Sequence, residues 1–531
     1  MNKVHLPPKD QLTLSQKVGQ LFMPAVFIND TEEEVQKMEL LISEHHIGSI
    51  CFFHSRASAA TNFEGKKKVV HNEKSYDRLK QLIARYQKAA KIPLLIAIDA
   101  EWGLAMRIEN TPQYPYAITL GALKNGNDLI HQIGKAIGSD CLNAGIHWNL
   151  APVVDINNNP ENPVIGYRSF GDDKEDVFTK AQAFTRGMSD SGILNSIKHF
   201  PGHGDTATDS HLGLPVIDKS LQELKENELF PFQQLIQKGV DSVMVGHLLL
   251  PQLDNEGPAT TSHKIISNLL REQMGFEGVI ISDALNMHAV SKTFSKKGDL
   301  EAKAFAAGMD VLCFSENVNE GIQTILKQEK SERIEESFHR IWKLKEKAFS
   351  NTTATEGLGW ETAASINADV AQNCITELYG SPSSCRALKT SPFLNLSLSN
   401  DKKNLFSQGL QDAYGSMALD IAWGLDQINV QIAEHENIVL AIFPPAVKPK
   451  NLFGFDEKVL ETIKSWIANK NVLLYLFGNP YVLDILGLRG NSNIVLVYQD
   501  FTEFQEVALQ HFMGKVPAKG SLPIQLKTFG L

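Results

Sequence analysis

Residues 193–211 read Ile193-Leu-Asn-Ser-Ile197 and then Lys198-His-Phe-Pro-Gly-His-Gly-Asp-Thr-Ala-Thr-Asp-Ser-His211. The first five residues form a largely apolar run, whereas the next fourteen include three histidines, two aspartates, one lysine and two glycines. This change predicts a buried strand that opens into a loop, where a rigid scaffold can present side chains to a ligand. We therefore expect the loop to line an active site.

Similar apolar runs recur through the first two-thirds of the chain and alternate with helical stretches. The alternation is typical of a parallel sheet covered by helices, and eight such units predict a (β/α)8 TIM-type barrel over residues 1–349. The expected strands are Leu21–Phe27, Ile47–Phe53, Pro93–Asp99, His147–Asp155, Leu194–Phe200, Ser242–Leu248, Gly278–Asp283 and Asp310–Phe314. Several end in polar residues, which would converge on the catalytic face at the carboxyl ends of the strands.

A second domain is expected after the barrel. A Lys- and Glu-rich helix over about Ser331–Phe349 closes the first domain, and residues 350–365 have the composition of a linker. Apolar strands then predict a smaller α/β sandwich with an open parallel sheet over residues 366–531; they are Asn437–Phe443, Asn471–Phe477 and Asn493–Tyr498. We expect this domain to support the barrel or to form a homodimer.

Composition narrows the class of protein. The chain of 531 residues is 43% hydrophobic and 21% charged, as in soluble globular proteins, and we expect no membrane span. Its net charge of −10 argues against a nucleic-acid partner. The first eight residues lack the apolar core of a secretory signal, so we expect a cytoplasmic protein, or a periplasmic one if a leader has been removed.

Asp283 is the first candidate catalytic residue, because it ends the run Gly278-Val-Ile-Ile-Ser-Asp283. Its carboxylate would leave the seventh expected strand at the catalytic mouth. There it can attack an anomeric carbon and form a covalent glycosyl intermediate. The alternative is that Asp283 caps the next helix.

Asp209 and His211 are the second candidates, since the two lie two positions apart and the carboxylate can orient the imidazole. A histidine held in this way can give a proton to a leaving oxygen and later take one from water. Alternatively, Asp209 is a turn residue and His211 a surface side chain. A third possibility is a metal site that adds His199, His203 and Asp205, but the proline and glycines of the segment exclude the helix that such spacing normally uses. We therefore expect no metal.

Other polar residues follow the expected strands and suit the hydroxyl groups of a sugar. They are Lys198 and His199 after the fifth strand, and Asp99, Arg107 and Arg168 after the third and fourth. A salt-bridge network that seals the top of the barrel would explain them equally well.

Together these segments resemble family-3 glycoside hydrolases, and in particular their β-N-acetylglucosaminidase branch. The resemblance rests on Lys198–His211 and Gly278–Asp283, with further support from Ala97-Ile-Asp-Ala-Glu101, Asn149-Leu-Ala-Pro-Val-Val-Asp155 and Ile165-Gly-Tyr-Arg-Ser-Phe-Gly171. One position departs from the common Glu-Gly-Gly pattern of the family: the chain has Glu101-Trp102-Gly103, which places a large ring beside the sugar site.

The resemblance implies a retaining exo-β-N-acetylglucosaminidase that releases terminal, non-reducing N-acetylglucosamine from short glycans such as peptidoglycan fragments, without a cofactor. It implies that Asp283 is the nucleophile and that His211 is the acid and base, assisted by Asp209. The residues implied in sugar binding are Asp99, Arg107, Arg168, Lys198 and His199. A β-glucosidase, a phosphorylase with the same intermediate and an inactive sugar-binding protein remain as alternatives.

Overall fold

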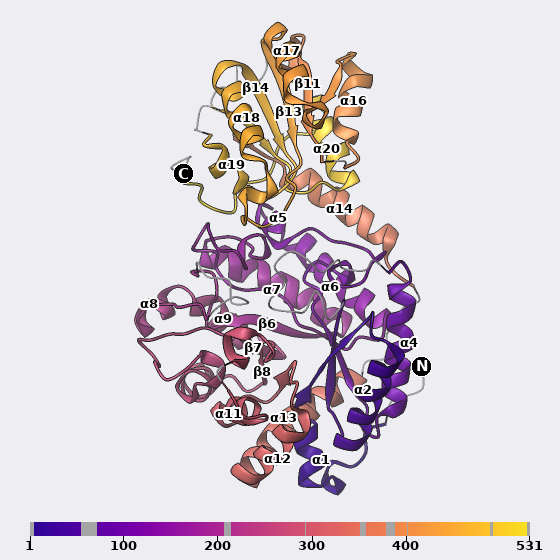
Figure 1. The fold of residues 1–531 in the computed structure, drawn as a ribbon, viewed down its shortest axis with the longest axis vertical. Helices are drawn as coiled ribbons and strands as arrows, with labels where there is room; N and C mark the ends of the chain where they lie inside the picture. The colour runs from indigo at the N-terminus through magenta and orange to yellow at the C-terminus, as the bar shows by residue number, and fades with distance from the viewer. Residues whose placement is uncertain are drawn as a thin grey trace. The chain divides into compact units, whose positions relative to one another are not determined.

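The computed structural model describes residues 5–54, 72–206, 214–292, 294–350, 357–378, 388–400, 402–488 and 492–527 (Figure 1). The chain divides into two compact units. The barrel unit comprises residues 1–114, 130–156 and 177–363, and the sheet unit comprises residues 115–129, 157–176 and 364–531. The two shorter segments of the sheet unit lie within the range that the sequence assigned to the barrel.

Seven strands of the barrel unit pair in chain order, each parallel to the next. They are β2 (Ala25–Phe27), β3 (Ser49–Phe53), β4 (Leu95–Ile98), β5 (Trp148–Asn149), β6 (Leu194–Phe200), β7 (Ser242–Val245) and β8 (Val279–Ser282). β1 (Phe22–Met23) pairs with β9 (Leu312–Cys313), and a parallel bridge joins Ile281 to Val311. The ring therefore runs from β8 through β9 to β1, as expected for a TIM-type barrel, with helices around the strands (Figure 1).

The predicted strands and the final helix of the barrel are confirmed, with shorter bounds in places. Pro24 separates β1 from β2, and the expected strand His147–Asp155 is regular only over Trp148–Asn149. The helix α13 spans Ser331–Ser350. The outer helices are amphipathic: α4 (Ser75–Ala89) buries Leu79, Leu82, Ile83 and Tyr86, whose spacing of three or four residues makes one face.

A buried charge network fixes β8 at the end opposite the candidate site. The carboxylate of Asp310 is inaccessible to solvent and accepts hydrogen bonds from Arg271 Nη2 at 2.7 Å and Arg340 Nη1 at 3.0 Å. It also accepts one from the backbone N–H of Ile280 in β8 at 2.9 Å. This network anchors the strand whose other end carries Asp283.

The sheet unit contains one six-stranded sheet in the order β10-β15-β14-β13-β11-β12. The strands are β10 (Thr376–Leu378), β11 (Leu394–Leu398), β12 (Ala418–Asp420), β13 (Asn437–Ile442), β14 (Asn471–Leu476) and β15 (Asn493–Leu496). The predicted strands β13, β14 and β15 are confirmed. All neighbours are parallel except β10, which runs antiparallel to β15 at the edge.

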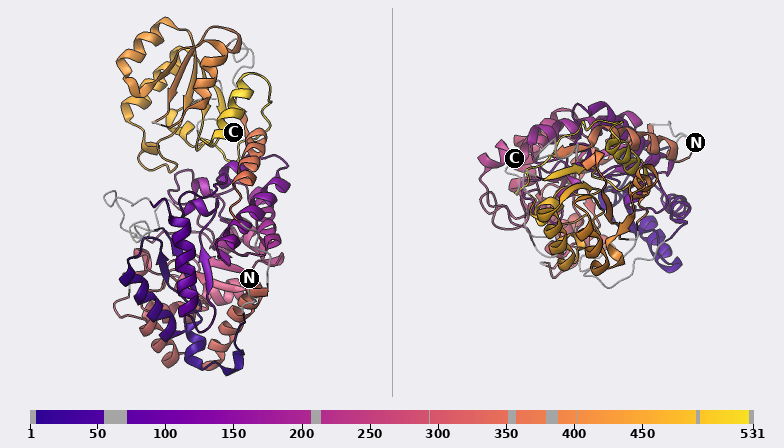
Figure 2. Two further views of the ribbon diagram at one scale, coloured as in Figure 1. Left: turned by 90° about the vertical axis from the view of Figure 1, so that its right-hand side faces the viewer. Right: turned by 90° about the horizontal axis from the view of Figure 1, so that it is seen from above.

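Helices cover both faces of this sheet, as predicted for a sandwich (Figures 1 and 2). The helices α16 (Leu405–Tyr414) and α20 (Thr502–Phe512) lie side by side on one face, and α18 (Glu457–Asn469) and α19 (Val482–Leu486) lie on the other. Among the described residues, no helix is long and apolar enough to cross a membrane.

Residues 115–129 and 157–176 belong to the sheet unit through specific contacts. Gln499 Nε2 donates to Thr119 Oγ1 at 3.0 Å, and Asn157 Nδ2 donates to the hydroxyl oxygen of Tyr481 at 2.6 Å. The N–H of Gln525 donates to Asp172 Oδ2 at 2.6 Å. These contacts join residues more than three hundred positions apart, so local sequence patterns do not reveal them.

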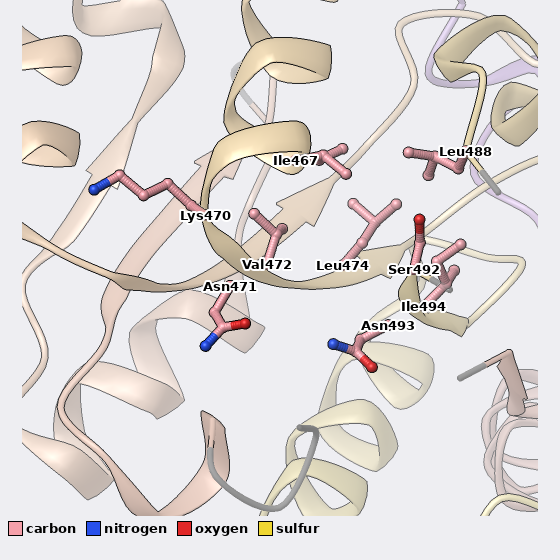
Figure 3. A pocket seen from close by; sticks show the side chains of 9 residues that line it. All are labelled: Ile467, Lys470, Asn471, Val472, Leu474, Leu488, Ser492, Asn493 and Ile494. Carbon is pink, nitrogen blue, oxygen red and sulfur yellow. The ribbon is translucent and has the colours of Figure 1, made fainter. Parts of the chain in front are cut away.

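A pocket of about 160 Å³ opens in the sheet unit at the amino ends of β14 and β15 (Figure 3). The side chains of Ile467, Leu474 and Leu488 converge there, with Asn471 and Asn493 beside them. In open parallel sheets, ligands bind at the opposite edge, where the strands have their carboxyl ends. We therefore assign this pocket no function.

The buried Lys345 gives a testable prediction on stability. Its ammonium is inaccessible to solvent and donates to Gln20 Oε1 at 2.5 Å and to the Pro93 carbonyl at 2.7 Å, and burial lowers its pKa to about 7. Between pH 7 and 10.5 the unfolded chain binds more protons here than the folded one, so the free energy of unfolding should rise with pH in this window.

We expect wild type to gain about 1 kcal/mol per pH unit relative to Lys345→Met between pH 7 and 8.5. Urea unfolding at the two pH values measures this difference. Parallel pH dependences in the two proteins would contradict it.

Candidate active site

The candidate residues of the barrel unit lie at the carboxyl ends of their strands. Asp99 follows β4, and Asp283 follows β8. Lys198 and His199 are among the last three residues of β6. A register shift between Lys198 and Phe200 interrupts the pairing of β6 with β7 at this level. Because the strands are parallel and close a ring, these side chains share one rim of the barrel.

Lys198 lies at the centre of a compact charge cluster. Its Nζ is 2.8 Å from Asp99 Oδ1 and 2.8 Å from Glu101 Oε1, and only 2% of its side chain is exposed. Arg107 Nη2 donates to Asp99 Oδ2 at 3.0 Å. Two cations thus face two carboxylates, which offsets the cost of burying each charge.

Neighbouring residues hold this cluster in place. Asn149 of β5 accepts from the N–H of Ala100 at 3.0 Å and donates to its carbonyl at 3.1 Å, which fixes the chain directly after Asp99. The Arg107 guanidinium carbon lies 3.7 Å from the centre of the Phe53 ring. Gly103 has φ 96°, and a Cβ there would lie 2.9 Å from the Pro112 carbonyl oxygen, so the turn requires glycine.

The charges of the cluster keep Asp99 ionised. Burial alone would raise the pKa of Asp99, but the positive charges of Lys198 and Arg107 outweigh this effect and hold the pKa below its ordinary value. An ionised Asp99 accepts hydrogen bonds, whereas Arg107 and Lys198 donate them. The cluster is therefore both the salt-bridge network considered above and a set of groups suited to sugar hydroxyls.

His199 belongs to a second network, centred on Asp155. The Asp155 carboxylate is inaccessible to solvent and lies 2.7 Å from His199 Nδ1. It also accepts from the backbone N–H of His199 at 3.1 Å and from that of His203 at 2.7 Å. Burial alone would raise the pKa of Asp155, but His199 and His203 lower it below its ordinary value.

His203 is a buried, neutral histidine in this network. Burial, with a contribution from His199, lowers its pKa to about 4, and its Nδ1 lies 2.9 Å from Thr206 Oγ1. Asp205, another member of the possible metal set, pairs with Lys219. Within the described residues, no group of three histidine, cysteine or acidic side chains could hold a metal ion.

Asp283 is oriented by β7 and by its own loop. Its N–H donates to the Val245 carbonyl at 2.9 Å, and its Oδ1 accepts from the N–H of Ala284 at 2.7 Å. His247 Nε2 lies 2.9 Å from the Ala284 carbonyl oxygen, which fixes the turn after the carboxylate. The next helix, α10 (His288–Ser291), has Met287 as its N-cap residue, so the helix-cap alternative for Asp283 is wrong.

Three predicted site residues are not brought to this rim by the described geometry. Arg168 belongs to the sheet unit, where it ends the short helix η3 (Gly166–Arg168). Asp209 and His211 lie outside the described residues. Their roles stay predictions.

The predicted list of site residues left out four residues that organise the rim, namely Glu101, Asp155, His203 and His247, although His203 was considered as a metal ligand and the other three as polar residues at the ends of strands. Asp155 and Glu101 stand at the ends of apolar runs, which is the signal that identified Asp99. His203 is held by Asp155 and Thr206, and His247 contacts Thr260 and the Ala284 carbonyl; the contacts with Asp155, Thr260 and Ala284 join separate parts of the chain and have no local sign in the sequence.

The comparisons with known proteins place the chain in a family. The sequence model of the glycosyl hydrolase family 3 N-terminal domain matches residues 13–344. The chain therefore belongs to glycoside hydrolase family 3 and is a glycoside hydrolase, which confirms the resemblance.

The similar proteins differ in their sequence identity to this chain and in the share of each chain that matches. The β-hexosaminidase A of Pseudoalteromonas piscicida is 32% identical over 372 residues, which cover 64% of this chain and 60% of that protein; the match thus spans less than two-thirds of the relative. A solved family-3 β-N-acetylglucosaminidase from Paenibacillus sp. str. FPU-7 is 26% identical with TM-score 0.77, covering 97% of this chain and 99% of its own. A solved β-glucoside phosphorylase, at 21% identity and TM-score 0.79 over 98% and 95% of the two chains, shows a shared fold alone.

Replacing Lys198 tests how far the rim depends on its charge. Lys198→Met leaves two largely buried carboxylates without their shared cation, so we expect the free energy of unfolding to fall by about 3 kcal/mol. Lys37→Met is the matched control, because Lys37 forms an equally direct but exposed pair with Glu33 at 2.6 Å, and it should leave stability unchanged. Chemical unfolding of the three proteins measures this; equal effects of the two substitutions would refute it.

Proposed function

We propose that the protein is a retaining exo-β-N-acetylglucosaminidase that removes terminal, non-reducing N-acetylglucosamine from short glycans, with peptidoglycan fragments as the source. The observation that carries the proposal is the position of Asp283. Its carboxylate leaves β8 on the rim that holds the Asp99, Lys198 and Arg107 cluster. The named activities of the hexosaminidase and β-N-acetylglucosaminidase relatives support the choice of sugar.

The first chemical step forms a covalent intermediate. A carboxylate oxygen of Asp283 attacks the anomeric carbon while the bond from that carbon to the leaving oxygen breaks. His211, oriented by Asp209, gives its proton to the leaving oxygen, and the released alcohol departs. The sugar is then an ester of Asp283 with inverted configuration.

The second step releases the sugar. Water enters on the vacated side, His211 takes one of its protons, and the water oxygen bonds to the anomeric carbon while the ester bond to Asp283 breaks. The two inversions leave the product in the original configuration, and both catalytic groups return to their starting protonation states.

The charge cluster binds and orients the terminal sugar in this proposal. Asp99 is ionised and accepts hydrogen bonds from sugar hydroxyls, while Arg107 and Lys198 donate to sugar oxygens. His199 is the further sugar-binding residue proposed on this rim, and sugar binding by Arg168, which belongs to the sheet unit, stays a prediction. The Asp155 network holds the backbone at His199 and His203, so it supports the segment that leads to His211.

Removing the nucleophile is the most direct mutational test of the proposal. Asp283→Ala should lose nearly all turnover of an aryl N-acetylglucosaminide, because no covalent intermediate can form, while its circular dichroism and melting stay those of wild type. Steady-state assays measure this loss, and full activity in the variant would remove the mechanism.

The acid role of His211 predicts a dependence on the leaving group. In His211→Ala, kcat/KM should fall by about 100-fold or more for a disaccharide, whose leaving alcohol needs a proton. It should fall far less for an aryl glycoside with an acidic phenol, which departs unprotonated. Equal losses on both substrates would count against the acid role.

The closest alternatives are a β-glucosidase and a phosphorylase. A neutral histidine, unlike a carboxylate, does not repel an incoming phosphate, so both water and phosphate suit the second step on electrostatic grounds. Assays of aryl glucosides and aryl N-acetylglucosaminides, with and without phosphate, separate the cases. We expect free N-acetylglucosamine in both conditions; a phosphate-dependent sugar phosphate would identify a phosphorylase.

A further inference from the structure

Two described segments lead into and out of the seven residues that include Asp209 and His211. The entering segment is held by Asp155, which binds the backbone N–H groups of His199 and His203. The leaving segment pairs with the chain after β7: the N–H of Ile217 donates to the Leu249 carbonyl at 2.9 Å, and the N–H of Leu249 donates to the Pro215 carbonyl at 2.9 Å. Each segment thus has its own attachment to the barrel.

Lys219 joins the two segments directly. Its Nζ, on the leaving segment, lies 2.6 Å from Asp205 Oδ2 on the entering segment. The same Nζ lies 2.6 Å from Glu228 Oε1, at the start of α9 (Leu229–Gln237). Asp205, Lys219 and Glu228 thus connect the entering segment, the leaving segment and the start of α9. We call these three side chains the Lys219 bridge.

The entering segment also packs tightly on this bridge. Gly202 has φ 125°, and a Cβ there would lie 2.8 Å from Glu228 Cβ, so the backbone at Gly202 lies against the glutamate side chain. Only 1% of the Glu228 side chain is exposed, compared with 26% for Lys219 and 32% for Asp205.

The Lys219 bridge differs from an ordinary surface ion pair because it is partly buried. An exposed pair is worth little, because water and salt screen it and both side chains lose freedom. Here a nearly inaccessible carboxylate holds the ammonium in place, so the contact with Asp205 is made by a group that is already ordered. Burial alone would lower the pKa of Lys219, but its hydrogen bonds with Asp205 and Glu228 raise it above the ordinary value.

We propose that Lys219 is a positioning residue for proton transfer by His211. The Lys219 bridge fixes the distance between the segment that precedes and the segment that follows the seven residues that include His211. The proposal rests on the acid role of His211 in the proposed function. Proton transfer depends steeply on the placement of the donor. A change in the distance between the two segments should therefore slow the departure of leaving groups that need a proton and spare the departure of those that do not. Lys219 itself contacts no substrate in this account.

The test uses kcat/KM for a series of aryl N-acetylglucosaminides whose phenols differ in acidity, because kcat/KM reports the step in which the leaving group departs. For Lys219→Met we expect about a 10-fold loss on the least acidic phenol and less than about a 2-fold loss on the most acidic, so that the dependence on leaving-group acidity steepens. Lys219→Arg, which keeps the charge, should recover most of the loss. Lys225→Met, an exposed lysine of the neighbouring helix α8 (Leu221–Glu226), is the control and should match wild type.

Asp205→Asn provides an independent variant, and its effect should not add to that of Lys219→Met in the double variant, since both break one bridge. If the loss in His211→Ala depends steeply on the acidity of the leaving group, then an equal loss across the series in Lys219→Met, or no loss, overturns the proposal. If His211→Ala shows no such dependence, the acid role in the proposed function is wrong and the positioning role falls with it. Melting temperatures and circular dichroism identify any variant that fails to fold, in which case Lys219→Gln and Asp205→Asn carry the test.

Discussion

The buried ammonium of Lys198 is the interaction on which the rim of the barrel depends. It joins β6 to the chain after β4 by contacting Asp99 and Glu101, and Asp99 in turn holds Arg107. Parallel strands bring these residues to one edge, but charges of one sign alone would not remain there in a buried setting. The alternation of two cations and two carboxylates lets the barrel keep charged groups ready to exchange hydrogen bonds with a ligand.

A second set of contacts organises the segment after β6. Asp155 holds the backbone at His199 and His203, and the Lys219 bridge ties that segment to the chain leaving it. The binding cluster and the segment that carries the proposed acid are thus built from different carboxylates. In the proposed mechanism, this division lets the sugar-binding cluster keep its geometry while the acid and base group is positioned independently.

Much of the barrel was predictable, because its strands, of two to seven residues, lie within longer apolar runs that alternate with amphipathic helices. Asp99, Lys198 and Asp283 were recognisable because they end such runs. The strands β10, β11 and β12 were not predicted, and β10 and β12, at the two edges of the sheet, have only three residues each. Residues 115–129 and 157–176 were assigned to the barrel because their contacts with the sheet unit, such as that of Asn157 with Tyr481, are distant in sequence. For the same reason the contact of His203 with Asp155 and the contacts of His247 with Thr260 and Ala284 were not foreseen.

The central claim is that Asp283 becomes covalently bonded to the sugar, and trapping that bond tests it most directly. A ring-fluorinated N-acetylglucosaminyl fluoride should accumulate the intermediate, because the ring fluorine slows both steps whereas the good fluoride leaving group speeds the first. Proteolysis and mass spectrometry should then find one sugar on the peptide that contains Asp283 and none on that peptide in Asp283→Ala. A sugar on a different carboxylate, or turnover with no adduct and with inversion at the anomeric carbon, would contradict the account.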